Sequence, residues 1–316
     1  MTLHAMTSPD SAGDALPWTP EERRHVADAV AHETRRVEIA PKFLPGFDVD
    51  RDTLTVTTDT VVDGDGAPFE TIDEAAVVPL VEIWSDFAMT PQQVKDEGSL
   101  HAARTLAIRA TNFLTRGQDA LIFRGQDATD DDPLFTEGKV RFRSGPAGSG
   151  LLGGLTEEQE VRVTATAAPH RFAERTLGAV TEACARLKGL GHYGPYALVL
   201  HDTVHGDVFS PLEGTLIQTA DRLRPMLHRG LYGTGTLPAS GASTSGLLVS
   251  LGGNSMDLVL GRRAEAHYLF DDADGLFRFR VSKRFALRLK TPSAVMKLVF
   301  DSNPEDPKPA DQETPE

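Results

Sequence analysis

Two histidines have the spacing of a metal-binding pair, but their surroundings do not fit one. His201 and His205 stand four residues apart in the run HDTVH, which would place both imidazoles on one face of a helix. The zinc-hydrolase pattern also needs Glu directly after the first His, where this chain has Asp202, and Gly206 follows the second. We therefore expect a loop or surface pair, not a metal site.

Two further patterns imitate ligand-binding loops. Residues 148–153 (GSGLLG) fit GxGxxG, but a dinucleotide site needs a helix to open there, whereas the chain continues as LTEEQEVRVT, which alternates like a strand. Asp48, Asp50 and Asp52 resemble the first half of a calcium loop, yet Thr53 occupies the position that needs Gly. Neither pattern predicts a bound ligand.

The remaining candidates for catalysis are also weak. Cys184 is the single cysteine and lies on the apolar side of an expected helix, so we interpret it as a small buried hydrophobe. The run 241–246 (GASTSG) lacks the GxSxG frame of a nucleophile elbow. The sequence therefore predicts no enzyme, no cofactor and no metal site.

The composition describes a globular protein. The chain has 316 residues, of which 40% are hydrophobic and 25% charged, enough for one elaborate domain or two modest ones. Its formal net charge of −14 argues against a nucleic-acid surface, because no basic stripe is visible in the sequence. No signal peptide and no apolar run of about 20 residues is present, so we predict a cytoplasmic protein without a membrane partner.

A helix is expected near the start of the chain. Thr19 as N-cap, Pro20 at the first helical position and Glu22 as the third residue make a capping box, and Pro41 limits the helix. Apolar side chains follow at near-helical spacing: Val26, Val30 and Val37. A second, long amphipathic helix is expected over residues 99–123.

Several segments have the residue pattern of β-strands. Residues 50–72 form two Thr/Val-rich runs around Asp63-Gly64-Asp65-Gly66, which predicts a hairpin with too little apolar content for a core of its own. Further strands are expected at 77–87 and 194–200, and helices at 171–191 and 221–227. Residues 246–298 predict one continuous antiparallel sheet that closes the fold.

Three of these segments together resemble the encapsulin family, the shell proteins of bacterial nanocompartments with the HK97 phage-capsid fold. VVPLVEIWSDF at 77–87, with the long helix after it, is similar to the family's PLIEL strand and spine helix, and GPYALVL at 194–200 is nearly the family's own string. GLLVSLGGNSMDLVLG at 246–261 is similar to its V-V-S-x-x-G-G-x-x-D-L-x-L-G run. The resemblance covers roughly residues 17–298.

The resemblance implies an α+β, HK97 capsid-like fold with a peripheral domain, an axial domain and an extended E-loop hairpin that pairs with a neighbouring subunit. The expected parts are a flexible N-terminus at 1–17, the N-terminal helix of the peripheral domain at 18–49, the E-loop at 50–76, the spine helix and an insertion at 77–150, the axial domain at 151–238, the closing sheet of the peripheral domain at 239–300 and a disordered acidic tail at 301–316. The insertion around 126–147 exceeds what compact members need, so an extra surface hairpin is expected there.

The same resemblance implies a function. Family members assemble into icosahedral cages, most simply of about 60 copies, and enclose a cargo enzyme that carries a C-terminal targeting peptide. Frequent cargoes are ferritin-like proteins and dye-decolorising peroxidases. Candidate residues for the cargo-peptide groove are Val26, Val30, Val37, Phe43, Leu258 and Leu260. Candidate residues for the loop at the five-fold pore are Pro211, Leu212, Glu213 and Gly214.

Two other hypotheses about the function stay open. A prophage HK97-type major capsid protein that packages DNA would share the fold, although the acidic balance weighs against a DNA-lined shell. A soluble metal- or nucleotide-dependent enzyme would have to use the HDTVH pair or the glycine loop. Some members carry a flavin-stacking Trp where this chain has Gln92, so no flavin is expected.

Overall fold

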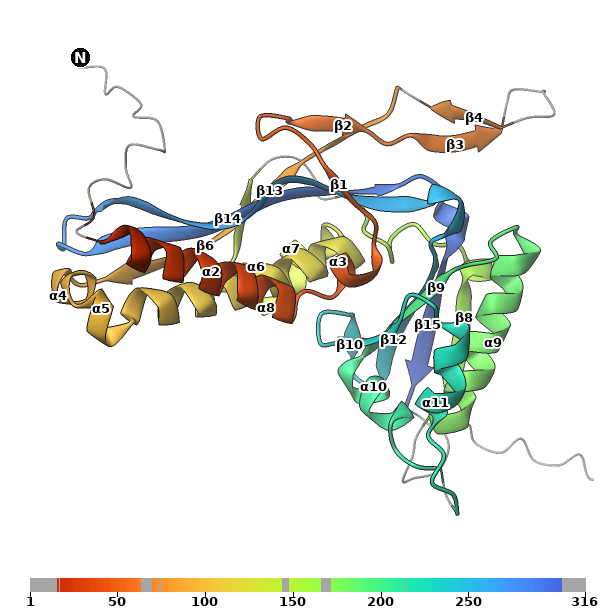
Figure 1. Ribbon diagram of the computed structural model, residues 1–316. Helices are drawn as coiled ribbons and strands as arrows, with labels where there is room; N and C mark the ends of the chain where they lie inside the picture. Colours follow the sequence, from red (N-terminus) through yellow and green to blue (C-terminus); the bar gives the residue numbers. More distant parts are fainter. Residues whose placement is uncertain are drawn as a thin grey trace, which may run out of the picture. The chain divides into compact units, whose positions relative to one another are not determined.

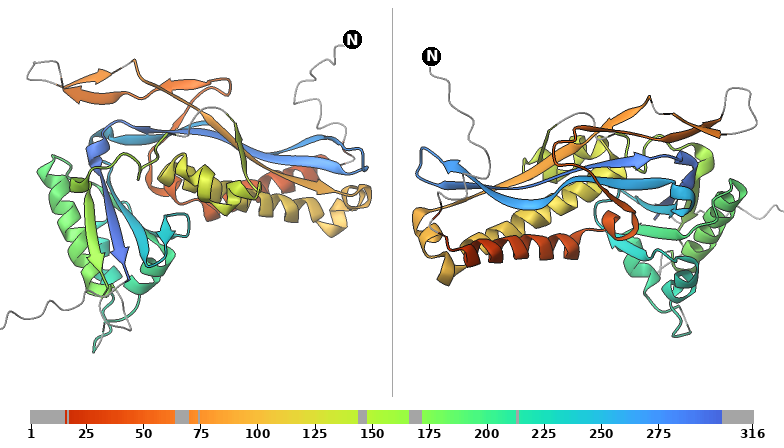
Figure 2. Two further views of the ribbon diagram at one scale, coloured as in Figure 1. Left: turned by 180° about the vertical axis from the view of Figure 1, so that it is seen from behind. Right: turned by 45° about the horizontal axis from the view of Figure 1, so that its top comes forward.

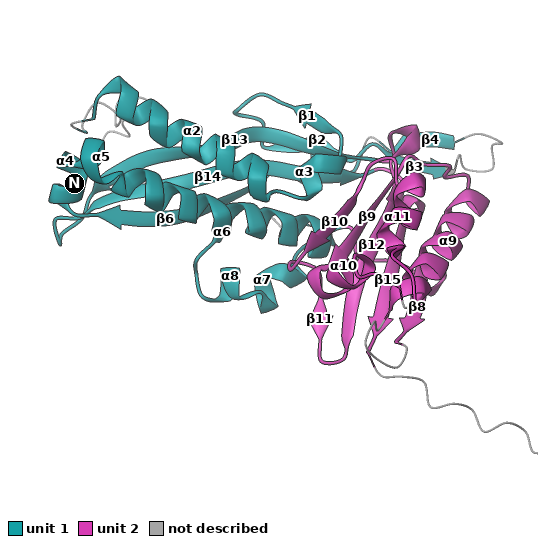
Figure 3. Cartoon of the chain, turned by 60° about the horizontal axis from the view of Figure 1, so that its bottom comes forward, with its two compact units in different colours: residues 1–150, 256–289 teal, residues 151–255, 290–316 magenta. Residues whose placement is uncertain are grey.

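The computed structural model describes residues 16, 18–63, 70–73, 75–143, 148–165, 172–212 and 214–302. These form two compact units, one made of residues 1–150 and 256–289 and the other of residues 151–255 and 290–316 (Figure 3). The chain therefore leaves the first unit, builds most of the second, returns to the first for one long hairpin and ends in the second.

The first unit contains a five-stranded sheet in the order β1-β13-β14-β6-β7 (Figure 1). All neighbours are antiparallel except β1, which runs parallel to β13. Its strands are β1 (Gly46–Asp48), β6 (Val81–Met89), β7 (Arg141–Arg143), β13 (Met256–Asp271) and β14 (Phe277–Leu289). Because side chains alternate along a strand, Phe279, Val281, Lys283 and Phe285 of β14 share one buried face.

Two long helices cover that face, as both views of Figure 2 show. Helix α2 (Pro20–Val37) begins with the predicted capping box, in which Thr19 and Glu22 bond to each other's backbone N–H groups. Helix α6 (Ala102–Arg124) confirms the long amphipathic helix and packs on β6, β14 and α2. Its buried alanines, Ala103, Ala107 and Ala110, permit close approach to the sheet.

Short helices connect these elements: α3 (Ala40–Phe43), α4 (Pro91–Lys95), α5 (Glu97–Leu100), α7 (Asp127–Asp131) and α8 (Pro133–Thr136). The last two occupy the segment 126–147, for which the sequence predicted an extra hairpin. Among residues 126–143, which the structure describes, only β7 is a strand, and it joins the main sheet beside β6. The prediction of a separate hairpin is therefore wrong in the described residues, because Phe135 packs edge-on against Phe142 and closes the segment onto its own unit.

The predicted hairpin after residue 50 is present. Its strands are β2 (Thr55–Thr57), β3 (Thr60–Asp63), β4 (Glu70–Asp73) and β5 (Val77–Pro79), with β2 antiparallel to β5 and β3 antiparallel to β4. The Asp-Gly turn lies outside the described residues, as do most of the N-terminal stretch 1–17 and of the acidic tail. We call residues 55–79 the acidic hairpin, because it carries acidic residues and no Lys or Arg.

The second unit is a sheet in the order β10-β9-β12-β15-β8, with β11 beside β12. Its strands are β8 (Glu160–Thr164), β9 (Tyr196–His201), β10 (Leu231–Thr234), β11 (Ala239–Ser240), β12 (Ser243–Ser250) and β15 (Val295–Asp301). Helices α9 (Ala173–Gly189), α10 (Asp202–Val208) and α11 (Thr219–Leu223) pack on it around one apolar cluster that includes Val180, Leu198 and Leu298.

The predicted single closing sheet over residues 246–298 is wrong. β12 and β15 pair with each other and with strands of the second unit, whereas β13 and β14 belong to the first. Short 3-10 turns at Gly252–Asn254 and Pro292–Ala294 stand at the two crossings. An alternating pattern identifies a strand but does not show which sheet the strand joins. For the same reason the expected domain boundary at residue 238 differs from the structure, in which the second unit continues to residue 255.

Candidate functional site

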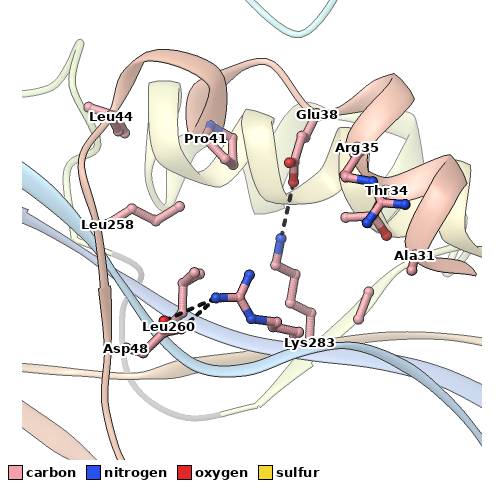
Figure 4. Close-up of a pocket in the computed structure, with 13 residues that line it drawn as sticks. Ala31, Thr34, Arg35, Glu38, Pro41, Leu44, Asp48, Leu258, Leu260 and Lys283 are labelled. Atoms are coloured by element: carbon pink, nitrogen blue, oxygen red, sulfur yellow. Dashed lines mark hydrogen bonds and ion pairs between the residues drawn. The ribbon is translucent and has the colours of Figure 1, made fainter.

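A cavity of about 370 Å³ opens in the first unit between the end of α2, the α3 corner and strands β1, β13 and β14 (Figure 4). We call it the corner pocket. Its apolar lining consists of Ala31, Pro41, Leu44, Leu258, Leu260 and Ala264. Its polar lining consists of Thr34, Arg35, Glu38, Asp48, Arg263 and Lys283.

A buried carboxylate holds the corner in place. Helix α2 ends where Glu38 turns to extended backbone, and α3 starts two residues later. The Asp119 carboxylate of α6 accepts hydrogen bonds from the backbone N–H groups of Ile39 (2.8 Å) and Ala40 (3.0 Å). Burial raises the pKa of Asp119 to about 7, although these hydrogen bonds act in the opposite direction. The corner thus depends on a side chain far along the chain.

A buried ammonium group extends into the same pocket. Lys283 is 4% exposed, and its Nζ lies 3.5 Å from Oε2 of Glu38 (Figure 4). Burial lowers the pKa of Lys283, and the carboxylates of Glu38 and Asp119 oppose that shift. Ionisable groups of β14, α6 and the corner therefore interact with one another here, and loss of its partners would leave the buried charge of Lys283 without compensation.

An exposed ion pair borders the pocket on the strand side. The guanidinium of Arg263 donates to both carboxylate oxygens of Asp48, at 2.9 and 3.0 Å. The parallel register of β1 and β13 places Asp48 opposite Leu260. An apolar floor with paired charges at its margins suits the binding of a ligand with apolar side chains, since it offers surface to bury and polar groups to fix orientation.

The structure separates the six predicted groove residues. Leu258 and Leu260 line the corner pocket, as the sequence led us to look for. Val30 and Phe43 are each 1% exposed and seal α2 and α3 onto their own unit. Val26 borders a different, aromatic cavity with Trp18 and Phe279, and the partly buried Val37 lies on α2 without lining the corner pocket.

Sequence reasoning missed the charged members of the pocket. Lys283 carried a signal, because it takes the place of a hydrophobe in the alternation Phe279, Val281, Lys283, Phe285 on the buried face of β14. Glu38 carried none, and neither did Asp119, which holds the corner without lining the pocket. Their contacts join residues 80 or more positions apart, and no local pattern reports such a pairing.

The predicted pore loop lies in the second unit, and Glu213 falls outside the described residues. Pro211 forms an isolated bridge with Gln218, and the backbone N–H of Leu212 donates to the carbonyl of Ile217 (3.0 Å). The tip between them is open to solvent, with Leu216 92% exposed. Residues 211–218 therefore form a short closed loop with an exposed apolar tip.

The histidine motif has structural roles. His201 is the N-cap of α10, where its Nδ1 lies 3.0 Å from the hydroxyl of Thr203. The ring of His205 packs against Phe209, with centroids 4.8 Å apart. Across the described ranges, no group of three or more His, Cys, Asp or Glu side chains could hold a metal ion. Cys184 is buried in the apolar cluster of the second unit, which raises the pKa of its thiol.

The glycine motif has a packing explanation. After Gly153 the chain forms the 3-10 turn Glu157–Gln159 and strand β8, not a helix that could hold a pyrophosphate. Gly125 ends α6 at φ 60°, and a Cβ there would lie 2.2 Å from the carbonyl oxygen of Gly148. A Cβ at Gly150 would in turn lie 2.4 Å from the backbone nitrogen of Gly125, so the glycines permit two chain segments to touch.

Comparison with solved structures defines the class of protein. The virus-like particle from Pyrococcus furiosus superposes with a TM-score of 0.62 at 15% identity, covering 89% of this chain and 100% of that one. The capsid of Myoviridae phage XM1 gives a TM-score of 0.56 at 12% identity, covering 84% and 92%. Such low identities establish the fold alone: the chain has an HK97-like capsid fold.

The sequence defines the family more narrowly. A family model described as encapsulating protein for peroxidase matches residues 51–286, so the chain belongs to this family, the encapsulins. It is also 32% identical over 124 residues to the type 1 encapsulin shell protein EncA of Myxococcus xanthus (strain DK1622), an alignment that covers 38% of this chain and 40% of that protein. Among the helices of the described residues, none has both the length and the apolarity to cross a membrane.

Proposed function

We propose that this chain is a non-enzymatic subunit that assembles with copies of itself into a closed icosahedral shell and encloses a cargo enzyme in the cytoplasm. The observation that carries the proposal is the family match over residues 51–286 on a capsid fold. About 60 copies make the simplest closed shell of this symmetry. The acidic hairpin supports self-assembly, because it exposes Val61, Ile72 and Val77 without a core of its own.

We further propose that the corner pocket receives a C-terminal peptide of the cargo. Apolar side chains of the peptide would lie on Leu258 and Leu260, and Arg35 and Glu38 would orient its backbone and polar groups. Many copies of the pocket inside one shell raise the effective concentration for a cargo oligomer that carries several peptides. Pro211, Leu212, Glu213 and Gly214 are proposed to belong to the loop at the five-fold pore. A ferritin-like protein or a dye-decolorising peroxidase would be a suitable cargo.

Cargo loading tests the docking proposal. Mass spectrometry of particles from native cells identifies the co-purifying protein, and its last 20 or so residues are then fused to a fluorescent reporter that is expressed with the shell. We expect Leu260→Asp to lower reporter loading about ten-fold, because a carboxylate replaces part of the apolar floor. Leu190→Asp, at a position 54% exposed outside the pocket, serves as the matched control. Equal loading by both variants would contradict docking in this pocket.

A DNA-packaging capsid is the second candidate, because phage capsids share the fold. The ratio of absorbance at 260 and 280 nm separates the two. Purified particles with the ratio of pure protein and a co-purifying enzyme agree with the cargo shell. Particles that contain protected DNA would identify a phage-type capsid instead.

A further inference from the structure

One edge of the sheet in the second unit is accessible to other molecules. Strand β8 stands at the end of the order β10-β9-β12-β15-β8 and pairs with β15. In the part of the chain that the structure describes, no strand lies on its other side. A cavity of about 670 Å³ opens between β8 and α9, with Glu160, Arg162 and Arg186 in its lining. A second protein chain can therefore reach this edge.

The sequence of β8 favours pairing with a further strand. Residues 160–165 (EVRVTA) contain two Val and one Thr, which favour strands, and neither Pro nor Gly. Val161 and Val163 are 3% and 4% exposed and lie in the apolar cluster of the second unit, so the strand is held in place on one face. An ordered edge strand of this kind is a template for a strand from another molecule.

The backbone of β8 offers hydrogen-bonding groups on its outer side. The N–H of Ala165 donates to the carbonyl oxygen of Asp301 in β15 at 2.8 Å. Because the backbone groups of successive residues in a strand point to opposite sides, those of Glu160, Arg162 and Thr164 point away from β15. These three residues form the outer edge of β8.

Two arginines of α9 bond to carbonyl groups of this outer edge. Nη1 of Arg175 donates to the carbonyl oxygen of Thr164 at 2.9 Å and to its hydroxyl at 2.6 Å. Nη1 of Arg186 donates to the carbonyl oxygens of Glu160 at 3.0 Å and Glu158 at 2.9 Å. Two of the three carbonyl groups on the outer edge therefore accept hydrogen bonds from the chain's own side chains.

The spacing of the two arginines matches the strand. Helix α9 lies beside β8 (Figure 1), and Arg175 and Arg186 are eleven residues apart on it, which corresponds to about 16 Å. Glu160 and Thr164 are four residues apart on β8, about 13 Å. The apolar cluster already holds the helix on the sheet. The two exposed arginines therefore have a role beyond the attachment of α9.

We propose that Arg175 and Arg186 protect the outer edge of β8 from pairing with β8 of a second copy. An incoming strand needs the outer carbonyl groups as acceptors, and the guanidinium groups already bond to two of them. Two approaching β8 edges would also bring like charges together. The two arginines thus act as specificity-determining residues, because they disfavour one wrong contact between copies. This inference goes beyond the proposed shell, since it concerns the single subunit.

Removal of the donors tests the role of the arginines in the full chain. Arg175→Met with Arg186→Met keeps long apolar side chains that favour a helix, but removes the hydrogen-bond donors. We expect this double variant to raise about ten-fold the fraction of protein in aggregates larger than the unmodified particle. Light scattering measures this fraction, and thioflavin T binding is expected to rise with it, because the aggregates contain additional strand pairs.

A matched control removes the same charge elsewhere in the second unit. Lys188 is an exposed residue of α9, and the side chain of Arg222 on α11 is 49% exposed. Lys188→Met with Arg222→Met is expected to leave the aggregated fraction at the value of the unmodified chain.

Proline in the strand separates edge pairing from lost stability. Arg162→Pro removes the outer N–H in the middle of β8, and an edge strand tolerates proline where its N–H faces outward. Added to the double variant, it is expected to return the aggregated fraction to nearly the value of the unmodified chain. The proline restores none of the lost hydrogen bonds, so a variant that aggregates because it unfolds would not recover.

Three results would overturn the proposal: an unchanged aggregated fraction in the double variant, an equal rise in the control pair, or continued aggregation after Arg162→Pro is added. Thermal unfolding of each variant accompanies the measurement. Light scattering of the unmodified chain gives the particle mass separately, so a failure of the shell proposal remains distinguishable from a failure of this one.

Discussion

The two units of the chain differ in how far the apolar residues of their strands are buried. In the second unit, residues 197–200 of β9 are all 0% exposed, and helices and strands enclose one apolar cluster. In the first unit, the acidic hairpin exposes Val61, Ile72 and Val77 by 37% to 58%. A sheet whose apolar residues are enclosed is complete as it stands, whereas exposed β-branched residues on a two-stranded ribbon need a partner. The contrast is thus between the sheet of the second unit and the acidic hairpin of the first, and the hairpin offers apolar surface for the proposed assembly.

This difference in burial predicts that a Val→Asp substitution lowers stability in the apolar cluster of the second unit but acts on assembly in the acidic hairpin. Val180→Asp places a carboxylate in the apolar cluster of the second unit, where Val180 is 0% exposed, and is expected to cost roughly 4 kcal/mol or more, with loss of soluble protein. Val77→Asp, in the hairpin, is expected to change the free energy of unfolding by less than about 0.5 kcal/mol and to act on assembly instead. Soluble yield and thermal unfolding measure the first effect, and particle fraction measures the second. Similar losses of stability in both variants would remove the distinction.

A buried carboxyl group gives the stability of the first unit a pH dependence in the acidic to neutral range. Well below pH 3.8 the Asp119 carboxyl is protonated in both the folded and the unfolded chain. Between its ordinary pKa of 3.8 and its folded pKa of about 7, only the unfolded state releases the proton, so stability falls as pH rises. The full difference is about 4 kcal/mol at most, since each pKa unit corresponds to about 1.4 kcal/mol.

Asp119→Asn isolates this effect. The amide keeps an acceptor for the corner and cannot ionise, so the fall in stability between pH 4 and pH 7 is expected to be smaller in the variant. Thermal unfolding of both proteins across this range, compared as a difference, removes the contribution of other acids. Parallel curves would mean that Asp119 is ionised throughout.

The helix starts of the two units allow a finer comparison. Helix α2 is capped locally by Thr19, whereas the backbone N–H groups at the start of α9 (Phe172 and Ala173) both donate to the distant carboxylate of Asp207 at 2.8 Å. Thr19→Ala is expected to cost about 1 kcal/mol. Asp207→Ala is expected to cost about 2 kcal/mol, because two hydrogen bonds to a charged acceptor are lost.

Thermal unfolding of both capping variants checks this order. Glu21→Gln, at an exposed first-turn position of α2, is the control and should shift stability by a few tenths of a kcal/mol. A larger loss from Thr19→Ala than from Asp207→Ala would contradict the view that the second unit depends more on long-range contacts.

The same division between local and distant contacts explains what the sequence could predict. The start of α2 was predictable because Thr19, Pro20 and Glu22 act on one another within a turn. Leu258 and Leu260 could be named as candidates because their run resembles a known family; both line the corner pocket, and their part in binding a cargo peptide stays a prediction. The charges beneath the pocket could not be predicted, since Lys283 and Asp119 meet only after α6 has packed on β14. The sequence also did not show which sheet β12 and β15 join, because alternation along a strand carries no information about its partner strand.

The mass of the purified particle tests the central claim most directly. About 60 copies of a 34.2 kDa chain give a shell of about 2 MDa. Light scattering on the unmodified protein, combined with negative-stain microscopy, is expected to show closed hollow particles of about this mass. A uniform species of only a few subunits under the same conditions would contradict the account.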